Sequence, residues 1–239
     1  CSQIVHICRR CIVLLLVKTF IKDWENVTDT KVREKYGILA SIVGIVLNLI
    51  LTTIKFIAGT LTGSISITSD AINNLSDAGS SIVTLVGFKI SNKPADKDHP
   101  FGHGRLEYVS ALVVSFIIML LGFELLKASF GKIRNPQPVE FSFVALGIMI
   151  FAIFAKLWLA FFNRRLGKKI NSPAMTAVVF DSLSDIAATS STVIALVVSR
   201  FSSIPIDGIM GIIVSCFIFW SGVKVLRETL GLLLGKPPE

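Results

Sequence analysis

The sequence has little charge for its length. Only 17% of its 239 residues are charged, whereas 52% are hydrophobic, and the mean hydropathy is +0.72. A soluble domain usually carries about 25% charged residues. The hydrophobic residues also lack the short amphipathic spacing of a soluble helix and occur in long blocks. This composition argues against a soluble domain and favours a membrane protein.

Cysteines are few as well, and Cys1, Cys8, Cys11 and Cys216 follow no disulfide pattern. On the predicted cytoplasmic side, Cys8-x-x-Cys11 is expected to stay reduced, and two cysteines alone are weak evidence for a metal or redox site. Residues 12–17, "IVLLLV", are too short to cross a bilayer, and no A-x-A-like cleavage site follows them. We therefore predict no cleavable signal peptide and interpret this segment as a helix lying on the membrane.

Six blocks are long enough to span a bilayer, which needs roughly 20 mainly apolar residues. Because a backbone in lipid must satisfy its own hydrogen bonds, we expect each block to be a helix. The blocks are too long, and alternate too little, for a β-barrel. The prediction is an all-α membrane protein with six transmembrane helices, at about 38–61, 65–90, 106–131, 141–162, 174–199 and 206–230.

Lysine and arginine concentrate on one set of the predicted connections. Most precede the first block, follow the last, or lie between the second and third or the fourth and fifth, while Lys132, Arg134 and Arg200 lie on the opposite side. The positive-inside rule then places both termini in the cytoplasm. This distribution accounts for the net charge of +8 without a nucleic-acid partner. Lys55 and Lys156 fall within spans, and we expect them to snorkel to the interface.

The chain divides into three predicted segments. Residues 1–35 form a cytoplasmic N-terminal segment, 36–235 a transport domain, and 236–239 the start of a linker to a cytoplasmic domain absent from the chain. Within the first, "KDWENVTDTKVREKYG" (22–37) carries charges at helical spacing, which predicts a cytoplasmic helix leading into the first span.

Polar residues interrupt the second and fifth blocks. Asn73 and Asp77 are four residues apart, as are Asp181 and Asp185, so each pair projects from one helix face. Charge inside a membrane is costly and usually marks an ion or proton pathway. Three carboxylates would not stay ionised together without a cation, and a divalent metal meets this need. Asp70, one turn outward, is a candidate supporting residue.

The four positions offer only oxygen donors, with no His, Cys or Met among them. Oxygen ligands suit Mn²⁺, Mg²⁺, Ca²⁺ or Fe²⁺ better than zinc, which prefers His and Cys but accepts carboxylates. The alternative is that these side chains only bond helices together. One polar residue per helix would suit that alternative, and two i,i+4 pairs suit it poorly.

Three motifs together resemble the cation diffusion facilitator family of divalent-metal/proton antiporters. They are "GSISITSDAINNLSD" at 63–77, "KPADKDHPFGHGRLE" at 93–107 and "FDSLSD" at 180–185, and the resemblance covers about residues 30–239. It implies a six-span cation-efflux-type bundle, a metal site at Asn73, Asp77, Asp181 and Asp185, and alternating access. It also implies a homodimer and a cytoplasmic domain after the last span.

The pattern Asn73-x-x-x-Asp77 with Asp181-x-x-x-Asp185 looks like that of the manganese-type members, whereas zinc members resemble His/Asp-x-x-x-Asp and His-x-x-x-Asp. The resemblance therefore implies Mn²⁺ efflux from the cytoplasm coupled to protons, with Fe²⁺, Zn²⁺ or Cd²⁺ as alternative substrates. Apart from the transported ion, no cofactor is expected. We place the protein as a multi-pass protein in a bacterial-type plasma membrane, in contact with lipid.

The loop between the second and third blocks holds Asp96, His99 and His103. In the family an equivalent loop binds zinc, so this is a candidate second metal site. The alternative is that these residues cap helices and order the loop, with Pro100 and Gly102 shaping its turn.

Other classes fit less well. An intramembrane aspartyl protease also buries two Asp, but "FDSLSD" lacks a GxGD-like context. A channel would show rings of like residues or filter loops, for which the outer connections are too short. A purely structural membrane subunit would not need buried charge.

Overall fold

Six long helices make up most of the protein. A computed structural model describes residues 13, 15–21, 23–62, 65–97, 99–100, 102–134, 143–198 and 206–234. The predicted spans are confirmed as helices, and most extend beyond the predicted bounds. The helices are α2 (Thr30–Thr62), α3 (Ile65–Ser91), α4 (Leu106–Arg134), α5 (Phe143–Ile170), α6 (Pro173–Val198) and α7 (Ile206–Leu233).

Five of these helices, α2, α4, α5, α6 and α7, are long and apolar enough to cross a membrane. Their outer faces carry large apolar side chains, among them Phe116, Leu120, Phe154 and Trp220, each more than half exposed. Exposed apolar surface on that scale is typical of a protein surface in contact with lipid. The protein is thus a multi-pass, all-helical membrane protein. The same criteria do not select α3, because Asp, Asn and Ser residues dilute its apolar sequence.

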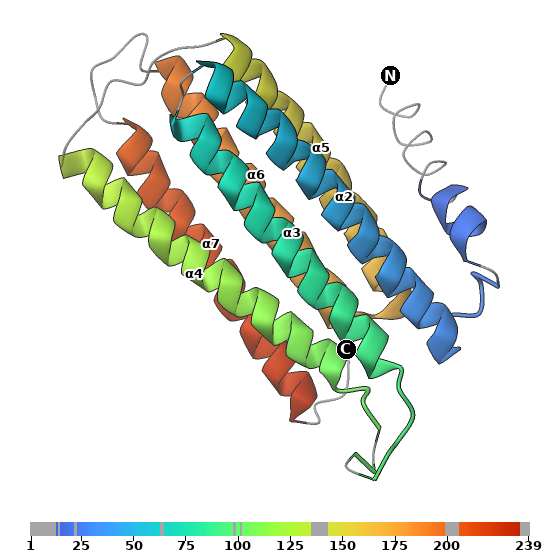
Figure 1. The fold of residues 1–239 in the computed structure, drawn as a ribbon. Coiled ribbons are helices and arrows are strands. Elements are labelled where there is room, and N and C mark those ends of the chain that lie inside the picture. The colour runs from blue at the N-terminus through green and yellow to red at the C-terminus, as the bar shows by residue number, and fades with distance from the viewer. Residues whose placement is uncertain are drawn as a thin grey trace.

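The helices form two layers of three. In Figure 1, α2, α3 and α4 lie in front, and α5, α6 and α7 lie behind them in the same order. The most extensive packing joins α4 to α7 and α2 to α3, whereas α3 and α6 touch over a short stretch only. The two polar helices therefore occupy the middle of each layer, where lipid does not reach their facing sides.

Small residues permit the close packing of α4 on α7. A Cβ atom added at Gly122 would lie 3.0 Å from the backbone nitrogen of Phe219, and one at Gly211 would strike the side chain of Ser129. Small residues at a helix interface allow backbones to approach and gain van der Waals contact where lipid offers no hydrophobic driving force. Helices α4 and α7 are therefore tightly packed together along one side of the bundle.

One end of the bundle gathers the start of α2 and α4 and the end of α3 and α5. Arg33 donates hydrogen bonds to the carbonyl of Ile170 and, at 3.2 Å, to the carboxylate of Glu107. Asn92 donates to Glu34 at 2.5 Å. These contacts tie four helix ends together at the end that the charge pattern assigns to the cytoplasm.

The prediction of a helix across 22–37 is wrong in its first part. Residues 23–29 form turns, and α2 begins only at Thr30. The side chain of Asp29 accepts a hydrogen bond from the backbone nitrogen of Lys31 at 2.8 Å, which caps the helix there. Before the turns, Val17 and Ile21 are buried against the bundle. Cys1, Cys8, Cys11 and residues 236–239 lie outside the described residues.

Candidate metal site

Two faces of α3 carry polar side chains toward different neighbours. Asn73 bonds to Asp185 of α6 and Asp77 to Lys156 of α5, while Asp70 and Asn74 both contact Lys55 of α2. Adjacent residues of a helix diverge by about 100°, because one turn takes 3.6 residues. The Asn73–Asn74 dipeptide therefore serves two separate polar clusters.

Three predicted ligands meet between α3 and α6. Asp77, Asp181 and Asp185 are 2%, 4% and 8% exposed, and one carboxylate oxygen from each lies within 4.8 Å of the others. Among the described residues, no hydrogen-bond donor reaches Oδ1 of Asp77. A buried carboxylate oxygen without a partner carries a desolvation cost that a bound cation would remove. We call Asp77, Asp181 and Asp185 the carboxylate triad.

The fourth predicted ligand stands at the edge of this triad. Asn73 is half-buried, and its Nδ2 lies 3.5 Å from Oδ1 of Asp185. Such a long hydrogen bond is weak, so little energy holds the amide in this orientation. A turn of the amide group would present its oxygen to the same space, which makes Asn73 available as an oxygen donor.

Lys156 of α5 is an unexpected member of the cluster. The prediction that it snorkels to the interface is wrong, because its side chain is 4% exposed. Its Nζ lies 2.7 Å from Oδ2 of Asp77 and 2.6 Å from Oδ2 of Asp185. Two carboxylates at hydrogen-bond distance hold the ammonium inside the bundle, since a buried charge needs a paired partner.

Lys55 of α2 is buried in the same manner, and the prediction that it snorkels is also wrong. Its side chain is 2% exposed, and its Nζ lies 2.7 Å from Asp70 and 2.5 Å from the side-chain oxygen of Asn74. The candidate supporting residue Asp70 is thus the ion-pair partner of a lysine. Sequence reasoning noted that both lysines fall within predicted spans but missed their burial and their carboxylate partners.

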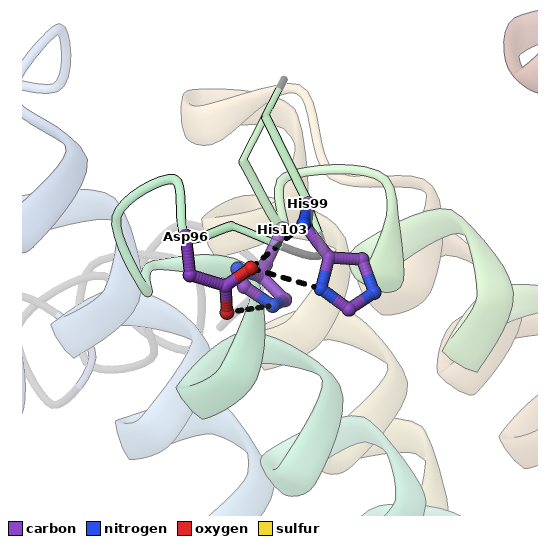
Figure 2. Close-up of side chains that lie close together, drawn as sticks. All are labelled: Asp96, His99 and His103. Carbon is purple, nitrogen blue, oxygen red and sulfur yellow. Dashed lines mark hydrogen bonds and ion pairs between the residues drawn. The ribbon is translucent and has the colours of Figure 1, made fainter.

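Figure 2 shows the second candidate site, in the loop between α3 and α4. Asp96 lies 3.2 Å from Nδ1 of His99 and 3.6 Å from Nε2 of His103, and the two imidazole rings are 4.5 Å apart. The ligand-type atoms of the three residues lie within 4.8 Å of one another. Gly102, next to His103, adopts a φ of 77°, a left-handed conformation that glycine readily allows in a turn.

The loop also keeps its carboxylate charged. The backbone N–H of His99 donates to Asp96 at 2.7 Å and holds the pKa of that carboxyl below its usual value. His103 is largely buried, and within the described part of the chain its Nδ1 has no hydrogen-bond partner. The loop therefore offers one carboxylate and two imidazoles, a ligand set that zinc prefers.

The class of protein follows from the bundle and the comparison with known families. A bundle of long apolar helices that encloses several carboxylates is typical of a membrane protein that handles cations. The family model for the cation efflux transmembrane domain matches residues 41–234. The chain belongs to the cation efflux family, also called the cation diffusion facilitators, and its role is divalent cation efflux rather than enzyme catalysis.

Individual relatives cover most of the chain. It is 32% identical to the manganese efflux system protein MneS of Bacillus subtilis over 200 residues, which are 82% of this chain and 67% of MneS. It is 29% identical to MneP of the same organism, also a manganese efflux system protein, over 85% of this chain and 71% of MneP. It is 29% identical to the cation-efflux pump FieF of Yersinia pestis over 78% of this chain and 62% of FieF.

Proposed function

We propose that the chain exports Mn²⁺ from the cytoplasm in exchange for protons, with Asn73, Asp77, Asp181 and Asp185 as the ligands. The observation that carries this proposal is the buried carboxylate triad, whose Asp77 Oδ1 has no donor among the described residues. The four proposed ligands all offer oxygen donors, which suit Mn²⁺ better than zinc. The relatives MneS and MneP, both manganese efflux system proteins, support the same metal.

Proton coupling follows from the chemistry of the ligands. A carboxylate binds metal only when it is deprotonated, so proton uptake and metal binding compete at the same oxygens. Protons arriving from the outer side expel the metal, and the protonated carrier returns to the inward-facing state. The limited packing between α3 and α6 lets the two halves of the site separate, as alternating access requires. The homodimer implied by the resemblance stays a prediction.

The test is metal-driven proton flux in proteoliposomes that contain the purified chain and a trapped pH-sensitive dye. We expect Mn²⁺ to drive the largest flux, followed by Fe²⁺, with Zn²⁺ and Cd²⁺ weaker. A larger flux with Zn²⁺ than with Mn²⁺ would favour zinc efflux, the alternative that the pattern at Asn73 and Asp181 disfavours. Metal uptake without any proton movement would contradict the antiport mechanism.

We further propose that Asp96, His99 and His103 bind a second divalent cation in the loop, with zinc as the preferred ion. The supporting observation is that their ligand-type atoms lie within 4.8 Å of one another, together with Nδ1 of His103, which has no hydrogen-bond partner among the described residues. The alternative is that Asp96 only orders the loop. The hydrogen bond that Asp96 accepts from the backbone N–H of His99 is compatible with that role.

The loop site predicts a separable binding event. We expect His99→Ala with His103→Ala to remove one Zn²⁺ per chain, measured by equilibrium dialysis of the protein in detergent, because two of three ligands are lost. Mn²⁺-driven flux should persist, since the loop lies outside the membrane-spanning helices. Lys97→Ala is the matched control, an exposed charge of the same loop. Unchanged zinc stoichiometry in the double variant would refute the loop site.

A further inference from the structure

Lys156 occupies a position that the transport mechanism above does not use. It comes from α5, whereas all four proposed ligands come from α3 and α6. Its ammonium bonds to one oxygen of Asp77 and one of Asp185, both proposed metal ligands. The cation that the described part of the chain places on the carboxylate triad is therefore a side chain of the protein itself.

A bound metal and this ammonium would compete. An ion bound to Oδ1 of Asp77 would sit beside the ammonium bonded to Oδ2 of the same carboxylate. Like charges at such range repel strongly where water is excluded. The same two carboxylates also cannot satisfy both cations at full strength. Binding of a divalent ion must therefore weaken or break the Lys156 ion pairs.

The flexible stem of Lys156 allows such movement. The residues one turn before and after it on α5 are Ala152 and Ala160, both small and buried. Leu159, three residues on, is the larger buried neighbour of that face. The lysine stem itself has four carbons and several rotatable bonds, so the ammonium can move without any shift of the helix. The ammonium is thus tethered at the site rather than fixed in it.

From this geometry we infer that Lys156 is an internal counter-cation, which occupies the carboxylate triad when no metal is bound and which the metal must displace. This inference rests on the proposed function. Lys156 lowers the affinity for metal, and it also holds α3, α5 and α6 together in the empty carrier. It is a positioning residue that weakens metal binding and thereby speeds metal release and turnover. A simple structural ion pair would not have this effect.

The experiment measures Mn²⁺ affinity of the full chain in detergent by isothermal titration calorimetry. We expect Lys156→Met to bind Mn²⁺ at least about tenfold more tightly, because the competing cation is gone, and to show slower Mn²⁺-driven flux in proteoliposomes. Lys156→Arg, which keeps the charge, should bind Mn²⁺ nearly as the parent does. Lys55→Met is the matched control, a buried lysine paired with Asp70 rather than with the triad, and its affinity should stay within about twofold.

If the uncompensated carboxylates destabilise Lys156→Met, thermal unfolding provides a second measurement of its metal binding. Addition of Mn²⁺ should raise the unfolding midpoint more in Lys156→Met than in the parent, since tighter binding stabilises the folded state further. Lys156→Gln, uncharged but polar, serves if the Met variant does not fold. Equal or weaker Mn²⁺ binding in both uncharged variants would overturn the inference.

The same measurements separate this inference from the proposed function. Asp77→Asn should lose Mn²⁺ binding, and if it binds as the parent does, the proposed metal site itself fails. If Asp77→Asn loses binding while Lys156→Met is not tighter, the metal site stands and only the counter-cation role fails.

Discussion

Asp77→Asn should abolish metal efflux, with a loss of Mn²⁺-driven proton flux of about 100-fold or more. Asp77 is 2% exposed, and no donor among the described residues reaches its buried Oδ1. The amide keeps the shape of the side chain but removes its charge and its titratable oxygen. The variant therefore loses a metal ligand and a proton carrier together. Proteoliposome flux with Mn²⁺ measures the effect.

The matched control for this substitution is Ser76→Ala, at the preceding position of α3. Ser76 is exposed, and its hydroxyl donates to the carbonyl of Ile72, one turn earlier in the same helix. We expect this variant to transport at the parent rate. Retained Mn²⁺ flux in a folded Asp77→Asn protein would remove Asp77 from the proposed ligand set.

Asn73→His should turn the metal preference toward zinc. An imidazole nitrogen replaces the amide oxygen at the edge of the triad, and zinc favours nitrogen ligands more than Mn²⁺ does. We expect the ratio of zinc to manganese flux to rise about tenfold, a difference of about 1.4 kcal/mol between the two ions. Asn73→Asp should move the ratio in the same direction, because it recreates the Asp-x-x-x-Asp pattern that the family resemblance associates with zinc members. The measurement is initial proton flux over a range of each metal.

The control for the selectivity change is Asn73→Gln, which keeps an amide oxygen on a longer stem. Its flux is expected to fall with both metals while their ratio stays near that of the parent. A ratio that is unchanged in Asn73→His would show that position 73 does not set the preference.

The helices were predictable from sequence because their signal is local. Long apolar blocks give six spans, and the observed bounds differ mainly by extra turns at the ends, such as α5 continuing through Lys168 and Lys169 to Ile170. The pairing of Asn73 with Asp77 and of Asp181 with Asp185 follows from the 3.6-residue period. That Asp77 lies near Asp181 and Asp185 rested on their chemistry and on the family resemblance, and the structure brings these three carboxylates together.

Lys55 and Lys156 were beyond local reasoning. Each is a single lysine in an apolar block, and a long stem makes snorkelling the cheaper choice when no partner is known. Their burial depends on carboxylates from other helices, Asp70 for one and Asp77 with Asp185 for the other. Lys156 of α5 and Asp77 of α3 are 79 residues apart in the sequence. Their contact therefore cannot be predicted from the spacing of polar residues within either helix.

The polarity of α3 has a consequence for how the protein is made. Asp at the centre of a helix opposes insertion into the bilayer by about 2.5–3.5 kcal/mol, and α3 carries both Asp70 and Asp77. The partner of Asp70, Lys55, is synthesised just before it, so α2 and α3 can enter the bilayer together as a hairpin. The partner of Asp77, Lys156, leaves the ribosome much later. Until α5 is inserted, Asp77 has no lysine partner in the membrane. We therefore expect Asp77 to stay protonated or in contact with the insertion machinery until then.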